Sequence, residues 1–346
     1  MRHHLKWFIK NIVRASLKPI VKLFYNPSPT IIVKLQAGLG NQMFQYALGR
    51  ALELRTRREV LFDRSWFENS FKRSNARTFE LDIFSLPISY SSKKEIPFDL
   101  RPARSWYGSF WNILLQRIWF ICGLPTRDVI FDCLHEFKSD ILEINANQNV
   151  FLNGYWQSDK YFKDVEDVIR NDFTFRIEPD KENQVILDKL AADTANGIET
   201  VSIHIRRGDY SSDPQIVASH GTLPLNYYQS AMSEIEKRFP KVLYYGFSDD
   251  LSWCRINLKF KGEFIFVNVN ENKPGWMDMR LMSSCRHHII ANSSFSWWAA
   301  WLNPNHDKVV IAPQKWLLNE KLSNKDMVPG NWIKIASPKG EAIFTV

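Results

Sequence analysis

From residue 200 onward, the sequence alternates short apolar runs with helix-length amphipathic segments, and this alternation constrains the fold more than any other feature. Turn residues bound each apolar run, so each run is predicted to be a strand. Strands that alternate with helices predict a parallel sheet, which binds ligands beyond the carboxyl ends of its strands. The predicted strands cover residues 201–205, 242–247, 264–269, 287–291 and 308–312.

The first half of the chain begins in the same way, which predicts a second α/β domain. The expected elements are strands at 31–35 and 59–62, a strand and turn at 149–158, a glycine turn at 38–42, and helices at 43–55, from 158 to about 170, and at 180–193. A chain of 346 residues is long enough for two hydrophobic cores. We therefore expect two α/β domains, at 29–175 and 176–346, that face each other across a cleft.

Residues 1–28 form a separate basic segment ahead of these domains. From Arg2 to Lys22, a lysine or arginine recurs every fourth residue among apolar side chains. This pattern predicts an amphipathic helix that lies on an anionic membrane surface through residues 1–24. A helix packed on the protein's own surface, or a loose tail, explains the pattern equally well. Its charges are too frequent for a membrane span.

The apolar stretch 105–125 contains Arg117, which favours a buried helix or a wall of an acceptor site over a membrane span.

The cysteine spacing indicates where the protein is located in the cell, and the net charge indicates which kind of partner it binds. The four cysteines, Cys122, Cys133, Cys254 and Cys285, form no closely spaced pair, so neither a zinc site nor a disulfide framework is indicated and a cytoplasmic location is expected. The net charge of +8 suits an anionic partner. Nucleic acid is not favoured, because the regular basic spacing lies in the N-terminal segment, apart from the motifs below.

The stretch VSIHIRRGDY ends a predicted buried strand with two arginines and is a candidate phosphate site. Side chains alternate along a strand, so Ser202, His204 and Arg206 share one face. Arg206 then lies at the carboxyl end of the strand, where its planar guanidinium can bind phosphate oxygens. Asp209 could orient Arg206 or Arg207. An ion-pair cluster with a purely structural role explains the same residues equally well.

A second candidate phosphate site is IIANSSFSWWAAWLN, in which a strand leads through a serine-rich turn into a helix. Backbone N–H groups at a helix start bind anions, and Ser293, Ser294 and Ser296 can cap the helix or donate hydrogen bonds. Two candidate phosphate sites therefore lie at strand ends of one predicted sheet. The tryptophans of this helix are expected to face the core rather than a sugar: Trp297, Trp298 and Trp301.

The stretch GLGNQMFQYALGRALELR, which starts at Gly38, also passes from a glycine turn into a helix. It lacks the third glycine of a dinucleotide-binding fingerprint. Asn41 and Gln42 are expected instead to offer neutral hydrogen-bonding groups to a sugar. No two aspartates in the chain are separated by a single residue, so the Asp-x-Asp element of many metal-dependent sugar transferases is missing. Arginine and helix-end charge would have to stabilise a leaving diphosphate.

Together, these motifs resemble the bacterial α-1,2-fucosyltransferases of glycosyltransferase family 11. HIRRGDY is similar to the family's H-x-R-R-x-D element, and GLGNQMFQYALGRAL, FLNGYWQS, YYGFSDD and NSSFSWWAAWLN extend the likeness from about residue 31 to 316. The resemblance implies a GT-B fold of two Rossmann-like α/β domains, with the acceptor side in residues 29–175 and the nucleotide-binding site in residues 176–346. It also implies inverting transfer, without metal or cofactor, from GDP-β-L-fucose to the 2-hydroxyl of a galactose-terminated glycan acceptor, such as a bacterial O-antigen.

The resemblance also implies roles for individual residues. Arg206 would bind the β-phosphate, and Asn41 would lie near the reacting sugar. The base that accepts the hydroxyl proton stays open among Asp209, Asp213, His220 and direct loss to water or phosphate. The residues implied to bind the nucleotide sugar are His204, Arg206, Arg207, Asp249, Asp278, Asn292, Ser293, Ser294 and Phe295.

Further alternatives remain open at this point. Either Asp278 or Asp249 is implied to recognise guanine or ribose. A fucosyltransferase of another linkage, such as α-1,6, would use the same phosphate chemistry. A non-catalytic carbohydrate-binding module would explain the 13 tryptophans but not two phosphate sites. A non-catalytic nucleotide-binding protein is the remaining alternative. The resemblance implies nothing for the N-terminal segment or for residues 88–148, so which glycan carries the acceptor galactose stays open.

Overall fold

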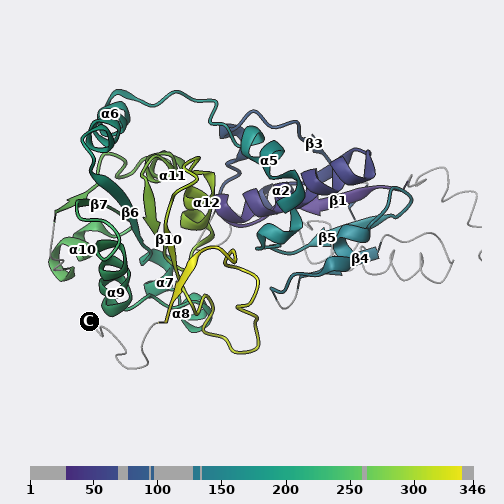
Figure 1. The fold of residues 1–346 in the computed structure, drawn as a ribbon. Helices are drawn as coiled ribbons and strands as arrows, with labels where there is room; N and C mark the ends of the chain where they lie inside the picture. The colour runs from purple at the N-terminus through teal and green to yellow at the C-terminus, as the bar shows by residue number, and fades with distance from the viewer. Residues whose placement is uncertain are drawn as a thin grey trace, which may run out of the picture.

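The structure is a computed structural model, and it shows two α/β units that meet near the middle of the molecule (Figure 1). The predicted basic helix, the apolar stretch 105–125, Cys122 and Cys133 lie outside the described residues. Within the described part of the chain, no helix has both the length and the apolar character that crossing a membrane requires. The described residues are 29–68, 77–92, 95–96, 128–132, 135–258 and 263–336.

The first unit is built on a five-stranded sheet in the order β3-β2-β1-β5-β4, and all of its pairings are parallel. The predicted strands β1, β2 and β5 are confirmed, whereas β3 and β4 at the sheet edges were not predicted. The strands are β1 (Ile31–Lys34), β2 (Val60–Asp63), β3 (Ser89–Tyr90), β4 (Asp128–Phe131) and β5 (Val150–Asn153). The helices are α2 (Leu39–Thr56), α3 (Ser65–Glu68) and α5 (Glu166–Asp172), with short 3-10 helices η2 (Leu81–Ile83), η4 (Ser139–Glu143), η5 (Asp159–Tyr161) and η6 (Lys163–Val165).

The second unit is built on a six-stranded parallel sheet in the order β11-β10-β9-β6-β7-β8. All five predicted strands are confirmed, with shifted ends, and the edge strand β11 was not predicted. The strands are β6 (Glu199–Ile205), β7 (Val242–Ser248), β8 (Phe264–Phe266), β9 (His287–Ile289), β10 (Val310–Pro313) and β11 (Ile333–Ile335). The helices are α6 (Lys181–Ala195), α7 (Gly208–Ser212), α8 (Pro214–Ser219), α9 (Leu225–Glu236), α10 (Leu251–Asn257), α11 (Trp276–Ser283) and α12 (Ser294–Leu302).

Strand β6 shows why the sequence folds in this way. Val201, Ile203 and Ile205 pack into an apolar cluster with residues of α9, on one face of the sheet. Ser202 and His204 face the other side of the sheet. There, the Ser202 hydroxyl lies 2.8 Å from Nδ1 of His288 on β9. The predicted alternation along this strand is therefore confirmed.

The two units share one continuous core where α2 meets α12, as Figure 1 shows near its centre. The Phe44 ring of α2 lies 4.6 Å from the Trp297 ring and 4.9 Å from the Trp298 ring. Nε1 of Trp298 donates a hydrogen bond to the Gly40 carbonyl at 2.9 Å. The Trp301 ring lies 4.0 Å from the Arg170 guanidinium of α5. The tryptophans face the core, as predicted, and they bury the interface between the units.

A segment after β10 returns to the first unit and adds a polar contact between the units. The Lys160 ammonium forms an ion pair with the Asp326 carboxylate, which is 7% exposed. Asp326 also accepts a hydrogen bond from the Phe137 backbone N–H at 3.2 Å. Two Rossmann-like parallel sheets joined in this way make a GT-B fold. The predicted domain boundary at residues 175–176 lies in the stretch that connects α5 to α6.

Candidate functional site

The two arginines that follow β6 form ion pairs with Asp249 and Asp250, which follow the neighbouring strand β7. The parallel register pairs Ile205 with Ser248, which brings Asp249 beside the arginines. Nη1 of Arg206 lies 2.7 Å from Oδ2 of Asp249. The backbone N–H of Arg207 donates to Oδ1 of the same carboxylate at 2.8 Å. Asp249 therefore orients the strand end, and a direct contact between Asp249 and a nucleoside stays a prediction.

The glycine of the RRGD motif is explained by this carboxylate. A Cβ atom at Gly208 would lie 2.4 Å from Oδ2 of Asp249, so a larger residue would displace the partner of Arg206. Arg207 is held differently. Its Nε lies 3.4 Å from Oδ2 of Asp250, and its guanidinium lies 3.5 Å from the Trp253 ring centre. The two arginines are therefore not equivalent, and Arg207 is anchored in contacts within its own unit.

His204 is a neutral, buried group beside the strand end. It is 5% exposed, and its ring lies 5.6 Å from that of Phe295. Burial and, to a smaller extent, the nearby Arg206 charge together lower the pKa of His204 to about 3. Its buried Nδ1 atom has no hydrogen-bond partner among the described residues. An uncharged imidazole can hydrogen-bond a ligand but adds no positive charge to the site.

The first turns of α2 and α12 approach each other at backbone distance. A Cβ atom at Gly40 would lie 2.5 Å from the carbonyl carbon of Ser294 and 2.7 Å from the nitrogen of Phe295. The Ser293 side chain caps α12 by accepting a hydrogen bond from Phe295 at 3.4 Å. Because helix N-termini carry partial positive charge, two such ends at one place favour an anion there. Asn41 follows Gly40 and accepts a hydrogen bond from the Gln157 side chain.

The prediction that Gln42 offers its amide to a sugar is wrong. Its side chain is fully buried, and Nε2 donates to the carbonyls of Ala37 and Thr78, both at 2.9 Å. Its Oε1 accepts from the Glu80 backbone N–H at 3.0 Å. These hydrogen bonds join the start of α2 to the segment before η2. The Gln42 amide is therefore used within the protein and is not available to a sugar.

Asn292 lies at the end of β9 and connects three loops around the strand ends. Its Nδ2 donates to the carbonyls of His220, Gly221 and Trp316 at 3.1, 3.3 and 3.2 Å. Its own carbonyl accepts a hydrogen bond from the Tyr210 hydroxyl at 3.2 Å. The structure therefore shows a loop-organising role for Asn292, and its predicted contact with a nucleotide sugar stays a prediction.

Asp278 lies in the first turn of α11, which begins beside α12. A Cβ atom at Gly275 would lie 3.7 Å from Cε2 of Phe295, in ordinary contact. The Asp278 carboxylate accepts a hydrogen bond from Nδ2 of Asn270 at 2.7 Å. Burial raises its pKa to about 6, despite the opposing effect of that hydrogen bond. The carboxylate is thus largely ionised at neutral pH and can accept further hydrogen bonds.

Loops after β4 and β5 add residues that sequence reasoning missed. His135 and Tyr155 stack with ring centres 5.7 Å apart and planes 14° apart. His135, Trp156 and, after β1, Ala37 have positive φ angles of 55°, 56° and 66°. Non-glycine residues in this region carry backbone strain, which concentrates at functional sites. Gln157 joins this segment to Asn41. The FLNGYWQS stretch is the signal that could have pointed to these residues.

The candidate bases are only partly placed. The Asp209 side chain lies outside the described part of the structure, so its predicted catalytic role stays a prediction. Nδ1 of His220 lies 2.8 Å from the Ser219 hydroxyl, and its ring lies 5.1 Å from that of Tyr210. Among the residues that the structure describes, no group of three or more His, Cys, Asp or Glu side chains is arranged to hold a metal ion.

Comparison with known proteins identifies the family. The sequence profile described as Glycosyl transferase family 11 matches residues 129–336. The chain is 32% identical over 314 residues to the Alpha-1,2-colitosyltransferase of Escherichia coli, covering 88% of this chain and 98% of that one. It is also 32% identical over 316 residues to the O-antigen biosynthesis glycosyltransferase WbnK of Escherichia coli, covering 87% and 99%.

A similar solved structure is the fucosyltransferase NodZ from Bradyrhizobium. The match has a TM-score of 0.41 at 16% identity and covers 81% of this chain and 95% of that one. A score at this level is too low to support residue-by-residue transfer. The fold assignment therefore rests on the two parallel sheets and their junction.

Proposed function

Because the chain belongs to glycosyltransferase family 11, we propose that it transfers L-fucose from GDP-β-L-fucose to the 2-hydroxyl of a terminal galactose in a bacterial surface polysaccharide. The relatives support an α-1,2 linkage and a role in O-antigen synthesis, since these words describe the two Escherichia coli proteins. One observation carries the proposal. Arg206 directly follows β6, β9 of the same sheet leads into α12, and α12 begins against the start of α2.

The donor diphosphate is proposed to lie between Arg206 and the start of α12. The guanidinium supplies a permanent charge that Asp249 orients, and the helix starts supply backbone N–H groups. Fixed donors of this kind stabilise charge without reorganising during the reaction. In this arrangement His204 stays neutral and hydrogen-bonds the donor or packs against it.

Transfer with inversion requires one displacement at the anomeric carbon of fucose. The acceptor hydroxyl oxygen forms a bond to C1 while the bond from C1 to the β-phosphate oxygen breaks, and the hydroxyl proton leaves to a base or to water. Negative charge therefore grows on the β-phosphate, where Arg206 stabilises it. Asn41, on the first-unit side of the junction, is proposed to orient the reacting sugar.

The guanine base is proposed to bind beside α11. An ionised carboxylate can accept two parallel hydrogen bonds from N1–H and the 2-amino group of guanine, and Asp278 is such a group. Adenine presents no matching pair of donors. This assignment gives Asp278 the base and leaves Asp249 to orient Arg206.

A second donor is favoured by one specific finding, the 32% identity to a colitosyltransferase along most of both chains. Colitose is fucose without its 3-hydroxyl group, so both sugars suit the same phosphate and guanine contacts. Rates measured in parallel with GDP-fucose and GDP-colitose distinguish the two donors. We also propose that no metal is required, and that residues 1–24 bring the enzyme to the inner face of the cytoplasmic membrane.

The proposal is tested by incubating the protein with GDP-fucose and a panel of galactose-terminated oligosaccharides, with and without a chelator, and determining the product linkage. We expect an α-1,2-linked product at the same rate in both conditions. Arg206→Ala should lower turnover by about a hundredfold or more while the fold is retained. A product with another linkage, loss of activity with the chelator, or full turnover by Arg206→Ala would each contradict the corresponding part of the proposal.

A further inference from the structure

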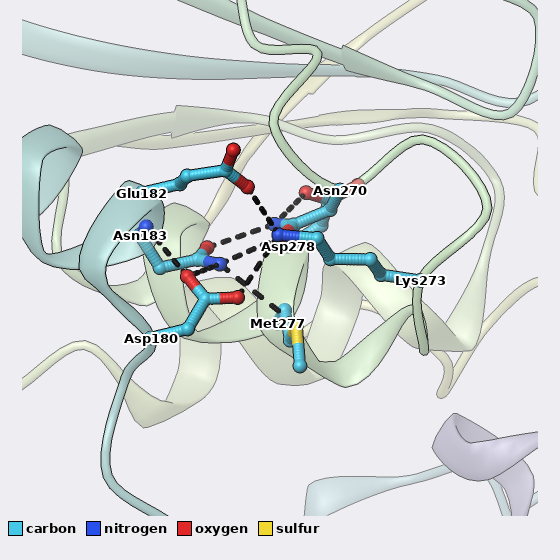
Figure 2. Close-up of polar contacts among 7 residues, drawn as sticks. All are labelled: Asp180, Glu182, Asn183, Asn270, Lys273, Met277 and Asp278. Atoms are coloured by element: carbon cyan, nitrogen blue, oxygen red, sulfur yellow. Dashed lines mark hydrogen bonds and ion pairs between the residues drawn. The ribbon is translucent and has the colours of Figure 1, made fainter.

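Two parts of the chain that are far apart in the sequence meet in a polar cluster at the start of α11 (Figure 2). The cluster joins the start of α6, the loop after β8 and the first turn of α11. At its centre, the side chains of Asn183 and Asn270 are 2% and 7% exposed. Nδ2 of Asn183 donates to Oδ1 of Asn270 at 2.8 Å, and Nδ2 of Asn270 donates to Oδ1 of Asn183 at 2.9 Å. Each buried amide therefore satisfies the other.

This reciprocal pair is anchored at the start of α6. Asp180 caps the helix, and its Oδ1 accepts hydrogen bonds from the backbone and side-chain nitrogens of Asn183 at 2.9 and 2.8 Å. On the outer side of the cluster, Lys273 forms ion pairs with Asp180 and Glu182. These outer side chains are 30 to 64% exposed, so solvent weakens their attraction.

The inner side of the pair reaches Asp278. Nδ2 of Asn270 carries a second hydrogen bond, 2.7 Å long, to Oδ1 of the Asp278 carboxylate. Among the described residues, that carboxylate forms no ion pair, so the amide is the group that offsets its burial. If the Asn270 amide turned over, its oxygen would face the carboxylate oxygen, and two acceptors would repel each other. The pair with Asn183 holds the amide in the favourable orientation.

We propose that Asn270 is a positioning residue for nucleobase selection, which keeps the Asp278 carboxylate ionised and turned so that it accepts two hydrogen bonds from guanine. The Asn183 side chain fixes Asn270, and α6 fixes Asn183. This inference rests on the proposed function, in which Asp278 contacts the base. It adds that base selectivity depends on an amide pair that does not itself touch the nucleotide.

A purely structural role makes a different prediction. If the amide pair only joined α6 to α11, its loss would weaken binding of every nucleotide by the same factor. Inosine diphosphate separates these roles, because hypoxanthine differs from guanine only in lacking the 2-amino group. The ratio of the two dissociation constants, IDP over GDP, therefore reports the second hydrogen bond to the Asp278 carboxylate.

The experiment is titration calorimetry of the full chain with GDP and with IDP. The wild-type protein should prefer GDP by about tenfold or more, because a hydrogen bond to a charged group is lost with IDP. Asn270→Asp keeps the shape but replaces the donor with a second carboxylate, so the preference should fall to about twofold or less. If that variant does not fold, Asn270→Ala removes the donor without adding charge and should act in the same direction. Thermal unfolding shows which variants fold.

Lys273→Met is the matched control. It removes two ion pairs from the same loop and the same helix but leaves Asn270 and its bond to Asp278 in place, so the GDP preference should remain at the wild-type value. In transfer assays, Asn270→Asp should raise the KM for the donor more than it lowers kcat.

One result overturns the inference, and it is distinguishable from failure of the proposed function. A folded Asn270→Asp or Asn270→Ala protein with the wild-type preference for GDP refutes the positioning role. If its affinities for GDP and IDP have both fallen by the same factor, the amide pair has a structural role instead. A wild-type protein without preference, or an Asp278→Asn variant that keeps the preference, refutes the proposed guanine contact itself. Fucose transfer by the wild-type protein is measured separately and is decided by its product.

Discussion

Replacing Gly40 with alanine should reduce sugar transfer by about a hundredfold, because the new methyl group forces the two units apart. The Cβ atom would lie 2.5 Å from the carbonyl carbon of Ser294, whereas carbon atoms in ordinary contact lie about 3.5–4.0 Å apart. The nearest atoms belong to the backbone of α12, so no side chain can turn aside. The starts of α2 and α12 must therefore separate by about 1 Å.

Overpacking of this kind costs about 1–3 kcal/mol, which the better helix propensity of alanine offsets by about 0.5–1 kcal/mol. We expect a net loss of about 1–2 kcal/mol in the free energy of unfolding. The effect on catalysis is larger, because a misplacement of about 1 Å between reacting groups costs about a hundredfold in rate. GDP should still bind, since Arg206, Asp249 and Asp278 all belong to the second unit.

The assay is steady-state transfer from GDP-fucose, with urea unfolding and GDP affinity measured on the same preparations. Gly38→Ala is a control in the same turn, because no atom lies within 4 Å of its Cβ position and its φ of −77° suits alanine. Gly49→Ala is a second control, since its Cβ would lie 2.5 Å from the Phe62 ring inside the first unit. Gly49→Ala should lose stability but keep its turnover. Wild-type kcat in a folded Gly40→Ala protein would refute the reasoning.

Three further changes test two residues of the site and one ion pair between the two units. Asp249→Asn should lower kcat by about tenfold or more without unfolding the protein, because the charge that orients Arg206 is lost; an unchanged kcat would count against that role. GDP-fucose affinity should fall as the pH is lowered through about 6, approaching a tenfold loss per pH unit. The reason is that burial raises the pKa of Asp278 to about 6, and a protonated carboxyl no longer accepts hydrogen bonds through both oxygens. Calorimetry should show that Asp278→Asn abolishes this dependence, and persistence of the dependence in that variant would assign it to another group. Lys160→Met should lower the free energy of unfolding by about 1–2 kcal/mol, because the largely buried Asp326 loses its cation; an unchanged urea midpoint and slope would show that the pair contributes nothing.

The sequence predicted the central strands of both sheets because their apolar patterns are strong and local. Strand β6, with Val201, Ile203 and Ile205 on one face, is the clearest case. The edge strands β3, β4 and β11 have two to four residues each, and their pairing depends on the neighbouring strand rather than on a pattern of their own. Helix α2 begins at Leu39 rather than at the predicted residue 43, because Gly40 is helical and serves a close approach to α12 instead of a turn.

The candidate site was predicted in its residue types more than in its contacts. The paired arginines and the serine turn could be found because they follow strands directly. Their partners could not, since Asp249 is 42 residues from Arg207 and becomes its neighbour only through the register of β6 and β7. Gln42 was misassigned because a helix start exposes some faces and buries others, and tertiary packing decides which. The amide pair of Asn183 and Asn270 spans 87 residues and leaves no local signal.

The central claim is that the donor diphosphate lies between the end of β6 and the start of α12, and a crystal structure with bound GDP tests it most directly. The account predicts β-phosphate oxygens within about 3 Å of the Arg206 guanidinium, the usual distance of a charged hydrogen bond, and close to the backbone N–H groups that begin α12. Electron density for the nucleotide at another place, with no phosphate oxygen beside the Arg206 guanidinium, would contradict it.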